Sequence, residues 1–580
     1  MNPHHTSTWL PTSAKELKAR GWEQPDIILF TGDAYVDHPS FGTAVIGRVL
    51  EAEGYRVAIV PQPNWRDDLR DFTKLGKPRL FFGVSAGNMD SMVNHYTANL
   101  RLRSDDAYTP GDKAGFRPDY AATVYTRILK QIYPDVPVVL GGIEASLRRL
   151  THYDYWSDAI KPSILLDSGA DLVSYGMGDI GMTDIAKAMN NGFNMNLLRK
   201  LPQVAFAADE KYVEKAGTGT VRLHSYEECA ADKYKFAENF VIVEAESNKL
   251  EARTIIEPHG DRFVVVNPPY PPMTEAQLDR THALPFTRLP HPRYRGKGAI
   301  PAYEMIKFSV NLHRGCFGGC SFCTISAHQG KFISSRSPQS ILSEVETLAK
   351  MEDFKGVLSD LGGPSANMYQ MAGQNKEMCR KCVRASCIHP NPCRNLHRDH
   401  NHLIDLYRRV RAVKGVKRAF IGSGIRYDMF INEADQSYLH EVIRHHVSGR
   451  LKVAPEHTEE HVLKLMRKPS FELYRKLQDK FKKACENEGL KYQLVPYFIS
   501  SHPGCTERDM QRLAAETKRL HMHLEPVQDF TPTPMTLSSV MYATGLNPHT
   551  KSPLYVARNQ DEKRKQKSYF FQEKKKKRSI

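Results

Sequence analysis

The sequence has 580 residues, of which 41% are hydrophobic and 25% charged, and its net charge is +16. This length predicts about two to four domains, and the composition excludes a wholly disordered chain. No apolar run approaches the roughly 18 residues that a membrane helix needs, and the first residues lack the apolar segment of a signal peptide, so we expect no membrane role.

Residues 1–299 alternate short apolar strands with amphipathic helices. Strands are predicted at 26–31, 56–60, 79–85, 137–142 and 171–176. Most of them end in glycine, which either turns the chain or lets a ligand approach the backbone closely. The alternation predicts a Rossmann-like, doubly wound α/β domain with a parallel sheet.

A proline-rich connector ends this first domain. Prolines cluster in Pro268–Pro272 and again in Leu289–Tyr294, and they make such a segment semi-rigid. We therefore place a domain boundary at residue 300.

Residues 300–555 repeat the order of strand then helix five or six times. Strands are predicted at 307–312, 356–363, 418–424, 451–457 and 492–500. A helix begins at Pro338, with Ser337 as its N-cap. Polar residues follow most of these strands, which predicts a full or partial (β/α) barrel with a site at the strand ends.

The last segment, residues 556–580, is rich in lysine and includes the run Lys574–Arg578. It predicts a disordered basic tail. Such a tail either contacts nucleic acid electrostatically or only keeps the chain soluble.

Cysteines mark the second half of the chain. Of ten, seven lie between Cys316 and Cys393, in two groups. Without a secretory signal, such grouping favours metal ligation over disulfides and predicts a reducing, cytoplasmic environment.

In the first group, Cys316, Cys320 and Cys323 stand in a glycine-rich loop just after a predicted strand. Three thiolates fill three corners of a [4Fe–4S] cluster and leave the fourth iron open to an external ligand.

This loop, with Phe322 before its third cysteine, resembles the cluster loop of radical S-adenosylmethionine (SAM) enzymes. Gly362 and Gly363 resemble the glycine motif that receives the amino group of SAM in that family. Residues at the ends of later strands resemble those that hold the rest of SAM; these are Ser423, Arg426 and Glu456.

The resemblance extends to one subfamily, the YgiQ-type radical SAM proteins. It rests on the segments 37–42, 141–146, 426–428, 496–504 and 528–532. It implies a radical SAM barrel and an amino-terminal domain with the topology of a cobalamin domain. It also implies a [4Fe–4S] cluster and exchangeable SAM, cleaved reductively to start radical chemistry on an unknown substrate. The electron would come from a low-potential donor such as flavodoxin or ferredoxin.

A second interpretation is an iron–sulfur or zinc protein that binds nucleic acid without SAM chemistry. The residues that resemble the SAM-binding half of the site argue against it, because a purely structural cluster does not need them. We name no catalytic acid or base, since lone histidines such as His457 and His502 are more often structural residues.

The second group contains Cys379, Cys382, Cys387 and Cys393, and we expect it to lie in a Cys-rich insertion near residues 373–400. It suits a zinc site or an auxiliary cluster, and reduced thiols in a basic loop are the alternative. The resemblance covers Cys382, Cys387 and Cys393 better than Cys379. Cobalamin is not predicted: in the Asp-x-His-x-x-Gly pattern of cobalamin domains, Val36 replaces the aspartate and Gly42 stands one residue too far along.

Overall fold

The computed structural model describes residues 8–192, 195–215, 217, 219–522 and 527–570. It is an α/β protein whose chain divides into two compact units. The main division lies between Lys307 and Phe308, whereas the sequence predicts a boundary at residue 300. Two short segments, Ser247–Leu250 and Thr274–Ala276, belong to the second unit. Within the described ranges no helix is both long and apolar enough to span a membrane.

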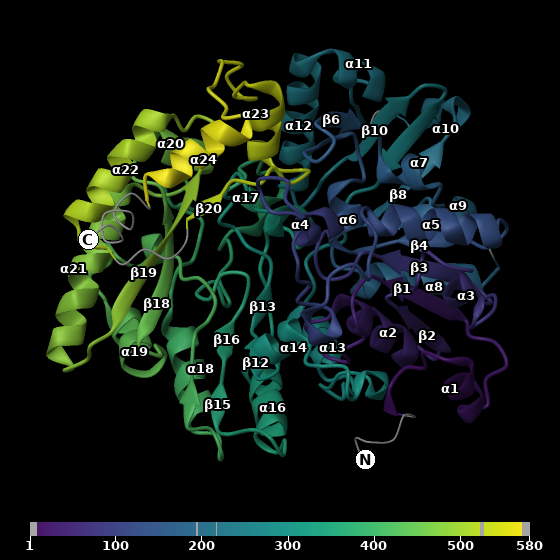
Figure 1. Ribbon diagram of the computed structural model, residues 1–580, viewed down its shortest axis with the longest axis horizontal. Coiled ribbons are helices and arrows are strands. Elements are labelled where there is room, and N and C mark those ends of the chain that lie inside the picture. The colour runs from purple at the N-terminus through teal and green to yellow at the C-terminus, as the bar shows by residue number, and fades with distance from the viewer. Residues whose placement is uncertain (1–7, 193–194, 216, 218, 523–526, 571–580) are drawn as a thin grey trace, which may run out of the picture. The chain divides into compact units, whose positions relative to one another are not determined.

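The first unit is built on a nine-stranded sheet with the strand order β2-β1-β3-β4-β7-β8-β11-β10-β9 (Figure 1). Its strands are β1 (Ile27–Thr31), β2 (Val57–Pro61), β3 (Phe81–Ser85), β4 (Val138–Leu140), β7 (Leu172–Ser174), β8 (Val204–Ala208), β9 (Thr220–Arg222), β10 (Thr254–His259) and β11 (Arg262–Val266). All five residues of β1 are buried. This is typical of a parallel strand that is covered on both faces of its sheet.

The sheet is mixed, which corrects the prediction of a parallel sheet. Strands β2, β1, β3, β4 and β7 pair in parallel, but β8 runs antiparallel to β7 and β11 antiparallel to β8 and β10. The cause is local at β10 and β11. Only Gly260 and Asp261 separate them, and so short a connection can join only antiparallel neighbours.

The helices of the first unit cover this sheet. They are α1 (Ala14–Ala19), α2 (Gly42–Ala52), α3 (Arg70–Thr73), α4 (Ser91–His95), α5 (Ala121–Ile132), α6 (Gly142–Leu147), α7 (Ile164–Ser168), α8 (Asp179–Asn190), α9 (Met195–Leu198), α10 (Glu210–Glu214), α11 (Tyr226–Ala231), α12 (Lys233–Ser247), α13 (Glu275–His282) and α14 (Pro301–Ile306); β5 (His152–Asp154) and β6 (Ala159–Lys161) form a separate hairpin. Helix α2 packs against α8, and α5 packs against α7. Aromatic side chains fill one layer, where Phe72 stacks on Phe30 and also contacts Tyr125.

The second unit repeats strand then helix, and most of its strand pairs are parallel. Its strands are β12 (Ser309–Asn311), β13 (His313–Arg314), β14 (Ser334–Ser335), β15 (Val357–Leu358), β16 (Asp360–Gly362), β17 (Arg418–Ala419), β18 (Arg450–Glu456), β19 (Gln493–Ser500) and β20 (Gln528–Asp529). The pairs β12–β16, β15–β17, β18–β19 and β19–β20 are parallel, and β13–β14 is antiparallel. Parallel neighbours place their carboxyl ends at the same edge, where a site can form.

Helices connect these strands, and several of them bury one apolar face. They are α15 (Ile325–His328), α16 (Pro338–Ala349), α17 (Lys376–Arg380), α18 (Asn401–Arg411), α19 (Ser437–His445), α20 (Glu460–Met466), α21 (Phe471–Asn487), α22 (Glu507–Arg519), α23 (Leu537–Thr544) and α24 (Gln560–Ser568). In α16, the buried residues Ile341, Val345 and Leu348 follow helical spacing. The predicted N-cap of this helix is confirmed, because the Ser337 side chain accepts a hydrogen bond from the Ser340 amide.

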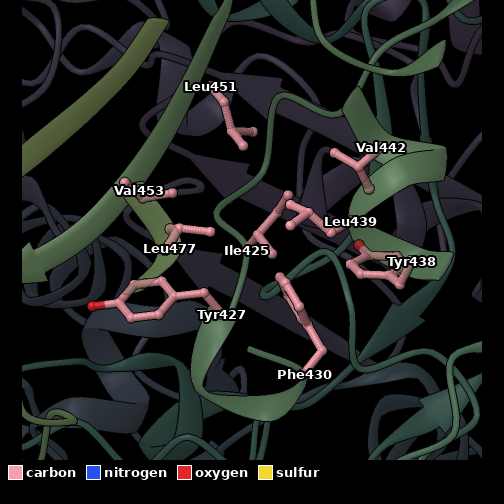
Figure 2. Close-up of a pocket in the computed structure, with 9 residues that line it drawn as sticks. All are labelled: Ile425, Tyr427, Phe430, Tyr438, Leu439, Val442, Leu451, Val453 and Leu477. Atoms are coloured by element: carbon pink, nitrogen blue, oxygen red, sulfur yellow. The ribbon is translucent and has the colours of Figure 1, made fainter. Parts of the chain in front are cut away.

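The core of the second unit contains a small apolar cavity beside β18. Figure 2 shows that its lining is aliphatic or aromatic and that the Tyr427 hydroxyl points away from the cavity. The lining residues are Ile425, Tyr427, Phe430, Tyr438, Leu439, Val442, Leu451, Val453 and Leu477. With no charged side chain in its wall, we assign this cavity to the core and not to the site.

The prediction of a disordered tail is wrong for residues 560–568, which form α24. Gln566 is buried, and its side chain accepts from the Ser501 amide at 3.0 Å and donates to the Cys505 carbonyl at 3.0 Å. Lys565 and Lys567 pair with carboxylates of α22 and β20. The sequence gives no sign of this docking, because Lys565 and Lys567 are neutralised by residues distant in the sequence. The segment Lys574–Arg578 lies outside the described residues.

Candidate functional site

The first cysteine group occupies a loop between β13 and α15. Two of its glycines have left-handed backbones, with φ of +85° at Gly315 and +61° at Gly319. A Cβ on Gly319 would lie 2.3 Å from the Ala385 carbonyl oxygen. The loop therefore needs glycine at these positions to turn this tightly.

The three thiols of Cys316, Cys320 and Cys323 face a common region. Burial raises the pKa of Cys323 to about 12, and the neighbouring thiols of Cys320 and Cys316 raise it further. Burial, and then Cys320, also raises the pKa of Cys316, although the Gly318 amide donates to its Sγ at 3.4 Å. Cys316 and Cys323, whose thiols resist ionising alone, are poor nucleophiles, whereas a metal that displaces their protons makes them ligands.

Arg426 connects the cysteine loop to the strand ends of the second unit. Its Nη1 donates to Cys320 Sγ at 3.3 Å, and its Nε and Nη2 donate to the Asp428 carboxylate at 2.9 and 2.6 Å. Burial lowers the pKa of Arg426, but Asp428 and the cysteines outweigh this effect and raise it overall. Arg426, which the sequence analysis expects to hold SAM, therefore has its guanidinium hydrogen-bonded to Cys320 and Asp428.

Asn367 fixes the backbone at this position. Its Oδ1 accepts from the Arg426 amide at 2.8 Å, and its Nδ2 donates to the Arg426 carbonyl at 3.1 Å. Asn367 is fully buried. The sequence analysis missed it, because nothing near residue 367 indicates a partner 59 positions further along the chain.

The predicted glycines lie where β16 ends, in close contact with side chains. A Cβ on Gly362 would lie 2.7 Å from Ser423 Oγ, and one on Gly363 would lie 2.7 Å from His313 Nε2. Ser423 in turn donates from its hydroxyl to the Asp360 carboxylate, which also accepts from the Ser423 amide. The structure thus brings Gly362 and Ser423 together, as the sequence predicts for residues that share one site.

Glu456 ends β18 in a left-handed conformation, with φ of +69°. Burial raises the pKa of its carboxyl group, and Lys468 partly offsets this, with its Nζ 3.5 Å from Glu456 Oε1. Lys468 also lowers the pKa of Cys316 and Cys323. It is therefore a cation shared by the strand end and the cysteine loop, and the sequence analysis missed it.

Phe322 and the neighbouring Ser321 anchor the cysteine loop to α23. The Phe322 ring lies edge-on to His502, with 6.3 Å between ring centroids. His502 Nε2 lies 2.7 Å from Ser538 Oγ, and that hydroxyl donates to Ser321 Oγ at 2.8 Å. Both imidazole nitrogens of His502 have partners, which favours a structural role.

The buried His313 ring predicts that the stability of this site depends on pH. Its ring is fully buried against Gly363, and burial lowers its pKa to about 4, against backbone hydrogen bonds at Ser365 and Arg314 that raise it. The unfolded chain therefore binds this proton more readily. Stability should fall as the pH drops from about 6.5 to about 4, by at most about 1.4 kcal/mol per pH unit from this group.

The matched variant is His313→Gln, which keeps an N–H donor for the Ser365 carbonyl but does not titrate. Urea unfolding midpoints of both proteins between pH 4.5 and 7.5 measure the effect. The advantage of the wild-type protein over the variant should shrink towards low pH, and a constant difference would contradict the assignment.

Asp37, the first residue of the Asp37-His38 pair, is held in an ion pair in the first unit. Asp37 Oδ2 pairs with Arg48 Nη2 at 2.6 Å, and both side chains are buried. His38 is fully buried, and its Nδ1 accepts from the Ser40 amide at 3.1 Å. The absence of cobalamin stays a prediction.

The second cysteine group lies at and after α17, next to the first loop in the same unit. The Cys387 amide donates to the Phe317 carbonyl at 3.0 Å. Phe317, Met368, Met371, Ile388 and Met429 form a small apolar cluster, and Cys316 and Cys387 both pack against it. The structure therefore brings the two groups to one place, although insertion loops like this one are not positioned by the sequence pattern.

Comparison with known proteins identifies the family. The Radical SAM N-terminal family model matches residues 9–309, and the model of a domain of unknown function, DUF3362, matches residues 525–575. A UPF0313 protein of Porphyromonas gingivalis is 58% identical over 580 residues, which cover 98% of this chain and 91% of the relative. One from Bacteroides thetaiotaomicron is 56% identical over 590 residues, which cover 98% and 95%.

Among solved structures, the radical SAM methyltransferase TsrM from Kitasatospora setae, with tryptophan substrate and a SAM analog bound, is similar at 14% identity. The match covers 88% of this chain and 75% of TsrM, with a TM-score of 0.47. A second structure of TsrM, with cobalamin and a [4Fe–4S] cluster bound, matches with the same score. On the sequence matches, this chain belongs to the UPF0313 family, the YgiQ-type radical SAM proteins.

Proposed function

We propose that this chain is a radical SAM enzyme, with a Rossmann-like first domain and a partial (β/α) barrel that carries the site. One observation carries the proposal. Three thiols, in a loop that needs glycine to turn, lie beside Arg426, which donates to Cys320, and beside Lys468, which pairs with Glu456 at the end of β18. Gly362 and Ser423 contact each other at neighbouring strand ends of the same unit. Membership in the UPF0313 family supports it.

The donor set fits an iron–sulfur cubane better than a zinc ion. A tetrahedral zinc ion with Zn–S bonds of about 2.3 Å needs thiolates about 3.8 Å apart. Among the described residues, no group of three ligand atoms within 4.8 Å of one another includes a cysteine. Three thiolates with wider spacing suit the corners of a [4Fe–4S] cluster and leave one iron for SAM.

When bound, the cluster and SAM supply one-electron reductive cleavage of a carbon–sulfur bond of SAM, which starts radical chemistry. Cys316, Cys320 and Cys323 hold the cluster, and Arg426 and Lys468 offset the negative charge of the ligands. Gly362 and Gly363 would present backbone groups to the amino group of SAM. Ser423 and Glu456 would orient the rest of SAM, and Phe322 would pack beside the cluster.

The experiment is anaerobic reconstitution of the full chain, followed by reduction with dithionite and addition of SAM. We expect about four iron atoms from this site, an EPR signal that changes with SAM, and release of 5′-deoxyadenosine. A low-potential carrier such as flavodoxin or ferredoxin should replace dithionite as the electron donor.

The test variant is Cys316→Ala/Cys320→Ala/Cys323→Ala, which should lose the SAM-responsive signal and SAM cleavage. Cys485→Ala is the matched control, because Cys485 is a buried cysteine in α21 of the same unit. Retention of SAM cleavage by the triple variant, or no cleavage by reconstituted wild-type protein, would refute the proposal.

A further inference from the structure

The four cysteines of the second group converge, although they are spread over 15 positions of the chain. Cys379 lies in α17, and the Cys382 amide donates to its carbonyl at 3.3 Å. The Cys393 amide donates to the Cys387 carbonyl at 2.8 Å. A tight turn and a seven-residue loop thus pair the cysteines, and the Cys387 thiol lies within electrostatic reach of the other three.

A buried lysine faces these thiols. Lys331 is 2% exposed, and its Nζ lies 4.0 Å from Cys382 Sγ and donates to the Arg384 carbonyl at 2.8 Å. In the described part of the chain, no carboxylate oxygen lies within 4.0 Å of it. Burying an ammonium group costs several kcal/mol unless an anion compensates it. Neutral thiols do not compensate it, whereas metal-bound thiolates do.

A buried asparagine also donates to the group. Asn395 Nδ2 lies 3.3 Å from Cys379 Sγ, and Asn395 is 8% exposed. Its Oδ1 accepts from the Asn375 amide at 2.7 Å, which holds the side chain in place. A Cβ on Gly373 would lie 2.6 Å from Cys379 Sγ, so this sulfur packs directly against the Gly373 backbone. Donors aimed at ligand sulfurs are typical of the second shell of metal centres.

From this geometry we propose that Cys379, Cys382, Cys387 and Cys393 bind a second [4Fe–4S] cluster. As in the first group, no three of these sulfurs lie within 4.8 Å of one another among the described residues, which is wider than the thiolate spacing of a zinc site. Four thiolates fill all four corners. This cluster therefore exchanges single electrons and has no open iron for SAM.

The second site stands next to the first within one unit. Besides the hydrogen bond from Cys387 to Phe317, the would-be Cβ of Gly319 lies 2.9 Å from Ser386 Cα, so the two loops touch backbone to backbone. The proposal itself does not depend on SAM chemistry, because its ligands, its buried lysine and its metal are separate from those of the first site.

Iron counting on the full chain tests the proposal. We expect about eight iron atoms in reconstituted wild-type protein, and about four both in the triple variant of the first site and in Cys379→Ala/Cys382→Ala/Cys387→Ala/Cys393→Ala. In the triple variant, the remaining iron should give a reduced EPR signal that SAM does not alter. This signal tests the second cluster on its own, because it does not depend on whether the wild-type protein cleaves SAM.

A milder variant guards against misfolding of the quadruple variant. Lys331→Met keeps the length of the side chain but removes its charge, and it should shift the reduction potential of the SAM-insensitive signal to more negative values. About four iron atoms in wild-type protein, zinc bound in place of iron by the triple variant, or an unchanged potential in Lys331→Met would each overturn the proposal.

Discussion

Replacing Arg426 with alanine should destabilise the second unit by about 3–5 kcal/mol, because it leaves the buried Asp428 carboxylate without its partner. Burial raises the pKa of Asp428, but Arg426 outweighs that effect and holds the pKa below its usual range. In Arg426→Ala that pKa must rise. The loss of stability should therefore be larger at pH 8, where Asp428 is charged, than at pH 5.

Two further variants separate the roles of Arg426. Arg426→Ala/Asp428→Ala removes both charges and should recover much of the lost stability, as a double-mutant cycle in urea will show. Both variants lack the hydrogen bond to Cys320 Sγ, so both should change the iron content or the midpoint potential of the first site. The double variant should not restore these two properties to their wild-type values. If the double variant is as unstable as Arg426→Ala, the pairing with Asp428 is not the cause.

Gly315→Ala should displace the first cysteine loop. A Cβ at this position would lie 2.2 Å from the Phe332 carbonyl oxygen and 3.0 Å from the Phe332 carbonyl carbon. Both are backbone atoms, which cannot shift without moving the chain. The residue also has φ of +85°. Strain and overlap together should cost about 2–5 kcal/mol, and because Cys316 follows directly, the iron of the first site should be lost as well.

Gly330→Ala is the matched control. Gly330 has nearly the same φ, +89°, but its Cβ would meet nothing within 4 Å. It lies beside the same loop, since its carbonyl accepts from the Cys316 amide at 3.1 Å. This variant should lose only the left-handed cost of about 1–2 kcal/mol and should keep its iron. If both variants lose equal amounts of iron, steric overlap at position 315 is not the cause of the loss. Chemical denaturation and iron analysis measure both effects.

Much of the second unit could be predicted from sequence because its signals are local. Periodic apolar residues and a Ser-Pro start marked α16, and short apolar runs marked the parallel strands. The antiparallel half of the first sheet was missed, since strand direction depends on which neighbour a strand meets. The helix α24 was missed for a similar reason: its lysines are neutralised by residues about 40 to 60 positions earlier.

The sequence alone determined the chemistry available at the site. The spacing of Cys316, Cys320 and Cys323, their glycines and the family resemblance depend only on neighbouring residues. Only the tertiary structure decided what surrounds the thiols. Arg426 reaches Cys320 across 106 positions, and Lys331 reaches Cys382 across 51. Such contacts follow from how helices and strands pack, and packing brings together residues whose separation along the chain carries no sign of their contact.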